Sequence, residues 1–317
     1  MTDHERILLA TTGWDPDAWL RIFRRECPDR ETVTEPDGPA DPSIRYAVVW
    51  KHVQGSLTHL PNLRAIFSLG AGVDHVFLDP SLPEVPVVRI VAGDLTMRMT
   101  EYVVWQVLDH VRQGPAYRDQ QRHRIWRELS QPAAVDITVG IMGLGVLGSD
   151  AAQKLSNIGF RIAGWSRSEK RIAGIACHHG AAGLDRFLGE SDIVVVLLPL
   201  TSETRGIIDA SLIARMKRHT PLGGPVLINA GRGGLQVETD ILAALDEGSL
   251  MAASLDVFKS EPLPPGSRLW NHPKVTVTPH VAATSDPARL VPELLREMEN
   301  LEQGRPVKGL VDMRTGY

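Results

Sequence analysis

Three polar side chains, Arg232, Glu261 and His280, stand among small residues in the second half of the chain. A histidine gains and loses a proton near neutral pH, so His280 can act as a general acid or base. A carboxylate beside an imidazole stabilises its charged form and fixes its orientation, which is the role we predict for Glu261. Arg232 can form a forked pair of hydrogen bonds with the carboxylate of a small acid and polarise its carbonyl group. Together they predict acid–base chemistry on an anionic substrate.

The segments that carry these residues each follow a short apolar run, namely Val226–Ile228, Met251–Leu255 and Val275–Val277. In an open α/β sheet, ligands bind beyond the carboxyl ends of the strands, so we expect the three side chains to converge there. Each residue taken alone is more often structural than catalytic. The prediction of a catalytic site therefore depends on all three residues occurring together and beside a cofactor-binding loop.

Short apolar runs bounded by turn residues recur along the chain with helical spacers between them, which predicts alternating strands and helices. Besides the three above, the runs are 7–10, 47–50, 65–69, 85–91, 137–142, 162–165 and 193–198. Parallel strands buried on both faces are continuously apolar, and 193–198 is the clearest case, so we place it mid-sheet.

Two helical patterns suggest where domains begin and end. Residues 100–124 predict one long connecting helix, and Leu290–Leu301 predicts a second helix near the C-terminus. We expect a discontinuous substrate-binding domain of residues 1–98 and 284–317 around a dinucleotide-binding domain of residues 99–283, with a ligand cleft between them.

A glycine-rich turn marks the predicted cofactor site. The strand 137–142 leads directly into Gly143, Leu144, Gly145, Val146, Leu147 and Gly148, and then into a helical stretch from Ser149 to Ile158. This G-x-G-x-x-G pattern, in the order strand, turn, helix, predicts a pyrophosphate at the helix N-terminus. A ligand-free glycine turn is the alternative. The predicted cofactor site also includes residues at neighbouring strand ends: Leu198, Pro199, Ala230, His280 and Ala282.

The next strand ends at Trp165 without a carboxylate to bind the adenosine ribose. It is followed by Ser166, Arg167 and Ser168, and a hydroxyl with a guanidinium suits a 2′-phosphate, so NADP(H) is favoured over NAD(H). The alternative is that Glu169 reaches the ribose and that Arg167 is merely solvated. Beside a reduced nicotinamide, the three polar residues predict hydride transfer to a carbonyl, with His280 donating the proton to its oxygen.

Composition excludes several other classes of protein. The 317 residues carry a net charge of −4 without a long block of one sign, which argues against nucleic-acid or anionic-membrane partners. The longest apolar run is far shorter than the roughly 20 residues of a membrane span. The N-terminus lacks a signal-peptide pattern, so we expect a cytoplasmic protein. Two cysteines, Cys27 and Cys177, fit a reducing compartment, and no clustered ligand set predicts a metal.

The sequence resembles the D-2-hydroxyacid dehydrogenase family, and most closely its glyoxylate/hydroxypyruvate reductase A branch. The motifs that carry the resemblance run nearly end to end: 69–74 (LGAGVD), 143–149, 165–168, 231–233 (GRG), 255–258 with 261–264, 278–283 (TPHVAA) and the tail from Val311-Asp312 to Gly316-Tyr317. The resemblance implies a Rossmann-type doubly wound parallel sheet and a discontinuous, flavodoxin-like α/β substrate domain.

The resemblance also implies a function for individual residues. It implies reduction of small 2-keto acids to D-2-hydroxy acids by Arg232, Glu261 and His280, with Asp256 as a partner of the nicotinamide carboxamide. The loop Gly70–Gly72 would hold the substrate carboxylate through backbone N–H groups of Ala71 and Gly72, and Trp50 and Lys51 would line the same pocket. It suggests a homodimer in which Trp126 reaches the partner's substrate pocket; an ordinary buried tryptophan is the alternative. A cofactor-sensing binding protein with little turnover, similar to a corepressor, remains the rival function.

Overall fold

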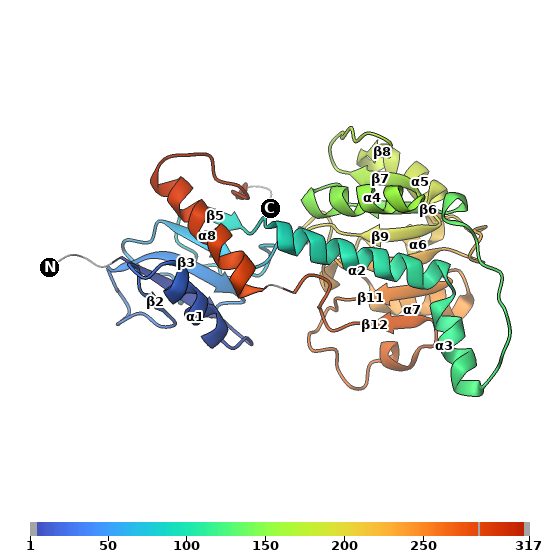
Figure 1. Cartoon of the computed structure of the whole chain (residues 1–317), viewed down its shortest axis with the longest axis horizontal. Helices are drawn as coiled ribbons and strands as arrows, with labels where there is room; N and C mark the ends of the chain where they lie inside the picture. Colours follow the sequence, from blue (N-terminus) through green and yellow to red (C-terminus); the bar gives the residue numbers. More distant parts are fainter. Residues whose placement is uncertain (1–4, 285, 314–317) are drawn as a thin grey trace. The chain divides into compact units, whose positions relative to one another are not determined.

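The computed structural model describes residues 5–284 and 286–313, and the end of the C-terminal tail motif, 314–317, lies outside this range. The chain forms two compact units (Figure 1). Unit 1 contains the described residues up to Leu95 and from 286 onward, and unit 2 contains Thr96–Thr284. The expected domain boundaries, 98/99 and 283/284, lie close to these positions.

Unit 1 is built on a five-stranded parallel sheet with the order β2-β1-β3-β4-β5, the order of flavodoxin-like folds. The strands are β1 (Arg6–Thr11), β2 (Thr32–Val33), β3 (Ile44–Trp50), β4 (Ala65–Ser68) and β5 (Val87–Arg89). Helix α1 (Asp17–Glu26) packs against α8 (Pro287–Glu302) from the far end of the chain. The hydroxyl of the buried Tyr46 donates a hydrogen bond to Glu302 at 3.0 Å, which ties α8 to β3.

Unit 2 is built on a seven-stranded parallel sheet with the order β12-β11-β10-β9-β6-β7-β8. Renumbered within the unit, this is 7-6-5-4-1-2-3, the doubly wound Rossmann order with one added strand. The strands are β6 (Thr138–Met142), β7 (Arg161–Ser166), β8 (Ala176–His179), β9 (Ile193–Val196), β10 (Val226–Asn229), β11 (Ala252–Leu255) and β12 (Val275–Val277). Both predicted sheet types are therefore confirmed.

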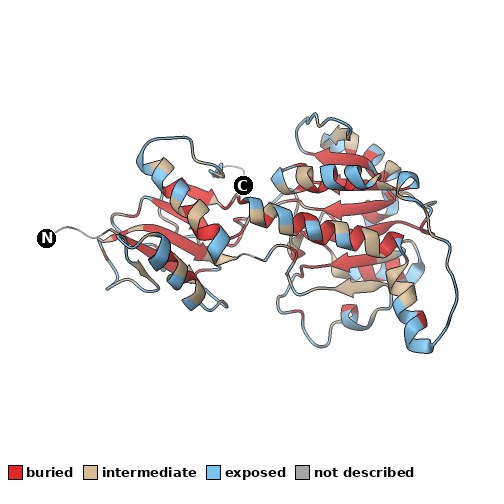
Figure 2. Cartoon of the chain, in the orientation of Figure 1, coloured by how far each residue is buried: buried red, intermediate tan, exposed pale blue. Residues whose placement is uncertain are grey.

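The central strands of the unit 2 sheet are fully buried among the helices of this unit (Figure 2). The helices are α2 (Gly93–Val111, which begins in unit 1), α3 (Gly114–His123), α4 (Val146–Ile158), α5 (Gly180–Glu190), α6 (Ala210–Arg215) and α7 (Glu238–Glu247), with short 3-10 turns η1 (Ala134–Asp136), η2 (Gly233–Leu235) and η3 (Arg268–Asn271). Strand β9 is fully buried at the middle of the sheet, as its apolar run predicts. None of the helices within 5–284 and 286–313 has the length and apolarity needed to cross a membrane.

One predicted helix is wrong. Residues 100–124 do not form a single helix, because the chain breaks between α2 and α3, where Gln113 adopts the left-handed conformation (φ 59°). Pro115 follows at the start of α3, where its missing N–H costs nothing, whereas it could not donate within a continuous helix. The sequence prediction also missed β2 and β8, which are short and lack an apolar run.

Candidate active site

The loops that follow parallel strands of unit 2 leave the sheet at one edge. Arg232 follows β10, Asp256 and Glu261 follow β11, and His280 follows β12, and these three strands are neighbours in the sheet. The glycine-rich turn follows β6, two positions from β10. Strand order therefore places the predicted acid–base residues and the predicted cofactor turn at the same carboxyl edge, where open α/β sheets bind ligands.

His280 and Glu261 form a direct pair. The His280 Nδ1 atom lies 2.9 Å from the Glu261 Oε2 atom, and the side chains are 31% and 22% exposed. Because an ionised carboxylate only accepts hydrogen bonds, Nδ1 carries the proton in this pair. The second ring nitrogen, Nε2, is then the atom at which an exchangeable proton is gained or lost. The other carboxylate oxygen, Oε1, accepts a hydrogen bond from the backbone N–H of Phe258 at 3.2 Å, which fixes the carboxylate.

His280 has a left-handed backbone conformation, with φ 55°. A side chain other than glycine rarely adopts this region, and it persists only where the surroundings hold it. The buried residue Asp256 does so: its carbonyl oxygen accepts from the N–H of His280 at 2.8 Å, and its carboxylate accepts from the N–H groups of Val281 and Ala282, both at 2.9 Å. Asp256 thus fixes the loop that presents the imidazole.

A chain of hydroxyl groups extends this anchor to helix α2. The Thr278 hydroxyl donates to the Asp256 carboxylate at 2.7 Å, so the hydroxyl of Tyr102, 2.8 Å away, must donate to Thr278. Burial raises the pKa of Tyr102 above its ordinary value, and the nearby Asp256 charge adds to the rise. The phenol therefore stays a donor over the whole physiological range.

The loop that carries Arg232 is held by two buried amides. Asn229, the last residue of β10, accepts from the N–H of Gly231 at 3.0 Å and donates to the Gln236 side chain at 2.8 Å. Gln236 in turn donates to the carbonyl of Val257 at 2.9 Å, at the start of the loop that leads to Glu261. The two loops are therefore held in one hydrogen-bonded frame. The Arg232 Nη1 atom donates to the carbonyl of Gly231 at 2.9 Å, and its side chain is half-buried.

The glycine-rich turn fits a dinucleotide. Gly143 has φ 117°, as a tight turn requires, and its N–H donates to the carbonyl of Trp165 on β7 at 2.8 Å, which ties the start of the turn to the sheet. A Cβ at Gly148 would overlap the carbonyl oxygen of Gly143, so only glycine allows α4 to approach the strand. A Cβ at Gly145, by contrast, would point into open space, as expected where a pyrophosphate approaches the backbone. The first N–H groups of α4 follow directly on this glycine, and the N-terminus of a helix suits an anion.

The residues after β7 are arranged in a way that suits a 2′-phosphate. The Ser166 hydroxyl donates to the carbonyl of Ser168 at 2.7 Å, so it holds the turn, and its oxygen can still accept. Arg167 is exposed, and its Nη1 lies 3.7 Å from Glu203. An exposed ion pair of this length is weak. Glu169, the alternative ribose ligand, has its carboxylate 3.0 Å from Arg171.

The predicted substrate residues of unit 1 also gather at one carboxyl edge. Trp50 ends β3 and Lys51 follows it, and Gly70–Gly72 follows the adjacent strand β4. The indole of Trp50 lies against Gly70 so closely that a Cβ there would overlap it. Lys51 has φ 47°, a second left-handed residue that is not glycine. Ala71 and Gly72 are half-buried, so a ligand can reach their backbone.

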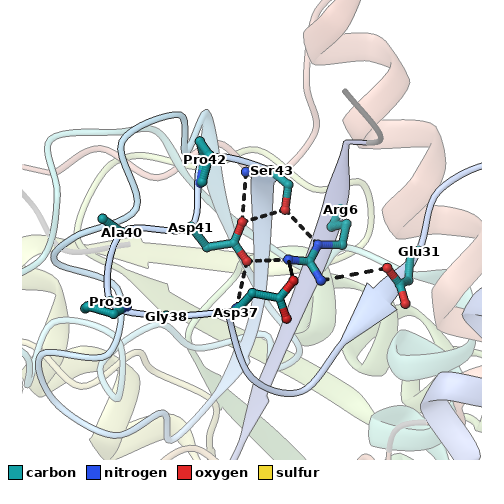
Figure 3. A pocket seen from close by; sticks show the side chains of 9 residues that line it. All are labelled: Arg6, Glu31, Asp37, Gly38, Pro39, Ala40, Asp41, Pro42 and Ser43. Atoms are coloured by element: carbon teal, nitrogen blue, oxygen red, sulfur yellow. Dashed lines mark hydrogen bonds and ion pairs between the residues drawn. The ribbon is translucent and has the colours of Figure 1, made fainter. Parts of the chain in front are cut away.

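Two further features of the chain are the exposed Trp126 and a hollow around Arg6. Trp126 is fully exposed, so the alternative of an ordinary buried tryptophan is wrong for the single chain. A hollow of about 630 Å³ around Arg6 lies at the amino edge of the unit 1 sheet, opposite the loops described above (Figure 3). There Arg6 binds Asp37, Asp41, Glu31 and Ser43, an ion cluster that joins β1 to the segment before β3.

The sequence analysis missed the residues that position the site: Asn229, Gln236, Thr278 and Tyr102 in unit 2, and Ser68 and His75 in unit 1. Each is buried or half-buried and forms hydrogen bonds to a functional loop. The available signal was a polar residue that ends an apolar strand, as Asn229 and Ser68 do. Such a residue must find a buried partner.

A family model described as "D-isomer specific 2-hydroxyacid dehydrogenase, NAD binding domain" matches residues 104–282, which span most of unit 2. This match defines a nicotinamide-dinucleotide-dependent dehydrogenase fold. The chain belongs to the D-isomer specific 2-hydroxyacid dehydrogenase family.

Solved structures of relatives agree with this assignment. The NADPH-dependent glyoxylate/hydroxypyruvate reductase of Sinorhizobium meliloti, in complex with NADP and sulfate, is 48% identical, with a TM-score of 0.94 over 99% of this chain and 100% of that one. A probable 2-hydroxyacid dehydrogenase of Rhizobium etli with NADP, HEPES and L(+)-tartaric acid is 41% identical (TM-score 0.91, 99% and 100% covered). A Xanthobacter autotrophicus family member with NADPH and MES is 37% identical (TM-score 0.93, 99% and 100%).

Proposed function

We propose that the protein is an NADPH-dependent reductase of small 2-keto acids such as glyoxylate and hydroxypyruvate, giving the D-hydroxy acid where the product is chiral. The observation that carries the proposal is the His280–Glu261 pair, 2.9 Å apart at the same sheet edge as the Gly143–Gly148 turn. Relatives with this fold bind NADP or NADPH, and one is a glyoxylate/hydroxypyruvate reductase.

The protein's own residues supply the proton and the charge complement. NADPH, when bound along Gly143–Gly148 with its 2′-phosphate at Ser166, Arg167 and Ser168, supplies the hydride. His280 gives the proton on Nε2 to the carbonyl oxygen, while Glu261 at Nδ1 stabilises the charged ring and holds its orientation. Arg232 binds the substrate carboxylate and polarises the carbonyl, which favours negative charge on its oxygen as the hydride arrives.

We propose functions for the other predicted residues of each unit as well. Asp256, beside its role in the loop, is the proposed partner of the nicotinamide carboxamide, and Leu198, Pro199, Ala230 and Ala282 line the cofactor. In unit 1, the N–H groups of Ala71 and Gly72 bind the substrate carboxylate, with Trp50 and Lys51 beside them. Backbone N–H groups in a glycine-rich turn suit an anion.

We extend the proposal to assembly and location. The fully exposed Trp126, next to the half-exposed Ile125, suits burial against a second copy of the chain, so we propose a homodimer. The free thiols of Cys27 and Cys177 suit a reducing, cytoplasmic location. Light scattering during gel filtration measures the mass of the assembly.

The test follows the absorbance of the reduced nicotinamide with glyoxylate or hydroxypyruvate, in parallel reactions with NADPH and NADH. We expect faster oxidation of NADPH, and a loss of kcat/KM of at least about 100-fold in Arg232→Ala, the size seen when one stabilising donor is removed. We also expect kcat/KM for reduction to fall with rising pH as His280 loses its proton, and oxidation to rise. Tight NADPH binding without turnover would instead favour a cofactor-sensing protein.

A further inference from the structure

The loop Gly70–Gly72 is held from beneath by Ser68 and His75. Ser68, the last residue of β4, is fully buried, and its Oγ atom accepts from the N–H of Gly70 at 3.2 Å. The same hydroxyl lies 3.2 Å from the carbonyl oxygen of Gly70 and 3.3 Å from that of Gly72, to which it can donate. One hydroxyl group therefore contacts both ends of the loop.

The ring of His75 fixes that hydroxyl. Its Nε2 atom lies 3.0 Å from Ser68 Oγ, and its Nδ1 atom accepts from the backbone N–H of Lys51 at 3.2 Å. A backbone N–H can only donate, so Nδ1 is bare and Nε2 carries the proton, which it donates to Ser68. The hydroxyl proton is then directed at the loop carbonyls. With this assignment every donor of the network has an acceptor.

The network also joins the two predicted substrate segments of unit 1. His75 bonds to Lys51, whose left-handed backbone (φ 47°) needs support, and through Ser68 to Gly70–Gly72. The Trp50 indole packs against the His75 ring with centroids 4.7 Å apart and stacks on Trp14 at 5.0 Å. The imidazole of His75 thus contacts the residue after β3, the last residue of β4 and the indole of Trp50.

We infer that Ser68 and His75 are positioning residues that set the N–H group of Ala71, and the two ends of the loop that carries the N–H of Gly72, for the carboxylate of the substrate. This inference rests on the proposed function of this loop. The two residues touch no reacting atom. Their bonds fix where the carbonyls of Gly70 and Gly72 point, and a peptide is planar, so they also fix the N–H groups of the residues that follow, Ala71 and Val73. The N–H of Gly72 lies between these two fixed peptides. The loop would hold the substrate carboxylate both in the ground state and in the transition state of hydride transfer. Loss of the positioned N–H groups would therefore weaken binding equally in both states.

The test compares Ser68→Ala and His75→Phe with the wild type. His75→Phe retains a ring against Trp50 and removes both hydrogen bonds. We expect KM for glyoxylate to rise about tenfold, the equivalent of about 1.4 kcal/mol, with kcat within about twofold and the NADPH dissociation constant unchanged. A merely structural role would lower the thermal midpoint and leave KM unchanged, and that result overturns the inference.

Unit 2 offers a matched control. Ser254 on β11 and His110 on α2 form a buried serine–histidine pair at 2.8 Å, and burial lowers the pKa of His110 to about 4, so this ring is neutral too. Ser254→Ala and His110→Phe remove the same chemical groups away from the loop. We expect them to lower the thermal midpoint without the rise in KM. An equal rise in KM in both pairs would overturn the inference.

A binding measurement separates this inference from the proposed function. Oxalate carries the carboxylate group that the loop would hold, and its affinity for the NADPH complex is measured by titration calorimetry. If the wild type shows no turnover but binds oxalate about tenfold more tightly than Ser68→Ala, the reductase proposal fails and the positioning inference stands. If the wild type turns over and the variants keep their KM and their oxalate affinity, the positioning inference alone fails.

Discussion

The two units hold their functional loops in different ways. In unit 2 the loop of His280 is held by a buried carboxylate, Asp256, through hydrogen bonds from two backbone N–H groups and the Thr278 hydroxyl. In unit 1 the loop Gly70–Gly72 is held by a neutral hydroxyl and a neutral imidazole. Both loops lie beside a left-handed residue that is not glycine, His280 in one and Lys51 in the other.

The difference follows from what each loop presents. The His280 loop presents a ring that gains positive charge, and a carboxylate anchor nearby favours that charge. The loop of unit 1 presents backbone N–H groups to an anion, and a carboxylate beneath it would repel that anion. Charge-assisted hydrogen bonds are also stronger than neutral ones. A carboxylate, the stronger hydrogen-bonding anchor, can therefore support the His280 loop, whereas beneath the anion-binding loop of unit 1 it would repel the ligand.

Replacing the charged anchor should have the largest effect. In Asp256→Asn the amide can accept on one atom only, so the N–H of Val281 or Ala282 loses its partner and the imidazole shifts. We expect kcat for glyoxylate reduction to fall about 100-fold, the cost of a displacement of about 1 Å in a reacting group. Steady-state kinetics at saturating NADPH measures it.

Asp192→Asn is the control for this variant. Asp192 is another fully buried carboxylate of unit 2, which accepts from the N–H of Thr138 and from Lys217 at the amino edge of the sheet. Its loss should lower stability and leave kcat within about twofold. If Asp256→Asn keeps a wild-type kcat, the anchor in unit 2 is no stronger than the neutral pair in unit 1.

Unit 1 also contains a buried carboxylate, Asp79, for which no bond to Gly70–Gly72 is seen among the described residues. It accepts from the N–H of Gly55, from the N–H and hydroxyl of Ser81, and pairs with His52 at 3.2 Å. Burial alone would raise the pKa of Asp79, but these hydrogen bonds outweigh it and lower the pKa to about 2. We expect Asp79→Asn to lower the free energy of unfolding by about 2 kcal/mol at neutral pH, with kcat unchanged.

The same group predicts a dependence on pH. The folded-state pKa of Asp79, about 2, lies below its ordinary value of 3.8, so its stabilisation is present above that value and is lost as the pH falls toward 2. The difference in thermal midpoint between wild type and Asp79→Asn should therefore shrink between pH 5 and pH 2. A constant difference over this range would show that the carboxylate charge contributes nothing.

The smallest effect is expected at the end of the unit 2 network. Tyr102→Phe removes one donor to Thr278, whose own hydroxyl still donates to Asp256. We expect a loss of about 1 kcal/mol in the free energy of unfolding and a fall in kcat of less than about fivefold, measured by urea titration and steady-state kinetics. If kcat falls as far in Tyr102→Phe as in Asp256→Asn, the main support of the His280 loop comes from Tyr102 on helix α2 and not from Asp256 after β11.

Sequence reasoning reached the parts of the fold and site that depend on local pattern. Apolar runs located the strands of both sheets except β2 and β8, and the order of strand, glycine turn and helix located the cofactor turn. Gly114 and Pro115 carried the signal for the break between α2 and α3, but the apolar stripe of 103–111 outweighed it in the prediction.

The positioning residues depend on packing that no local pattern records. A serine such as Ser68 at a strand end is typical of a turn, and nothing in the sequence shows that His75 folds back onto it. Asp256 was predicted as a cofactor ligand from the resemblance. Its hydrogen bonds with the N–H groups of Val281 and Ala282 became apparent only from the three-dimensional structure. Pair interactions across 24 or 25 residues require the fold itself.

Unit 2 is one uninterrupted stretch of chain, whereas unit 1 needs both ends of it. This has a consequence for synthesis on the ribosome. Domains fold as units while the chain emerges, so unit 2 has all its strands before α8 exists. Strands β1–β5 must wait, with Tyr46 lacking Glu302 and α1 lacking its packing partner, until the last helix leaves the exit tunnel. The strands that are synthesised first thus belong to the unit that is completed last. Between the synthesis of β5 and the release of α8, the incomplete unit 1 is the part of the chain that chaperones would bind.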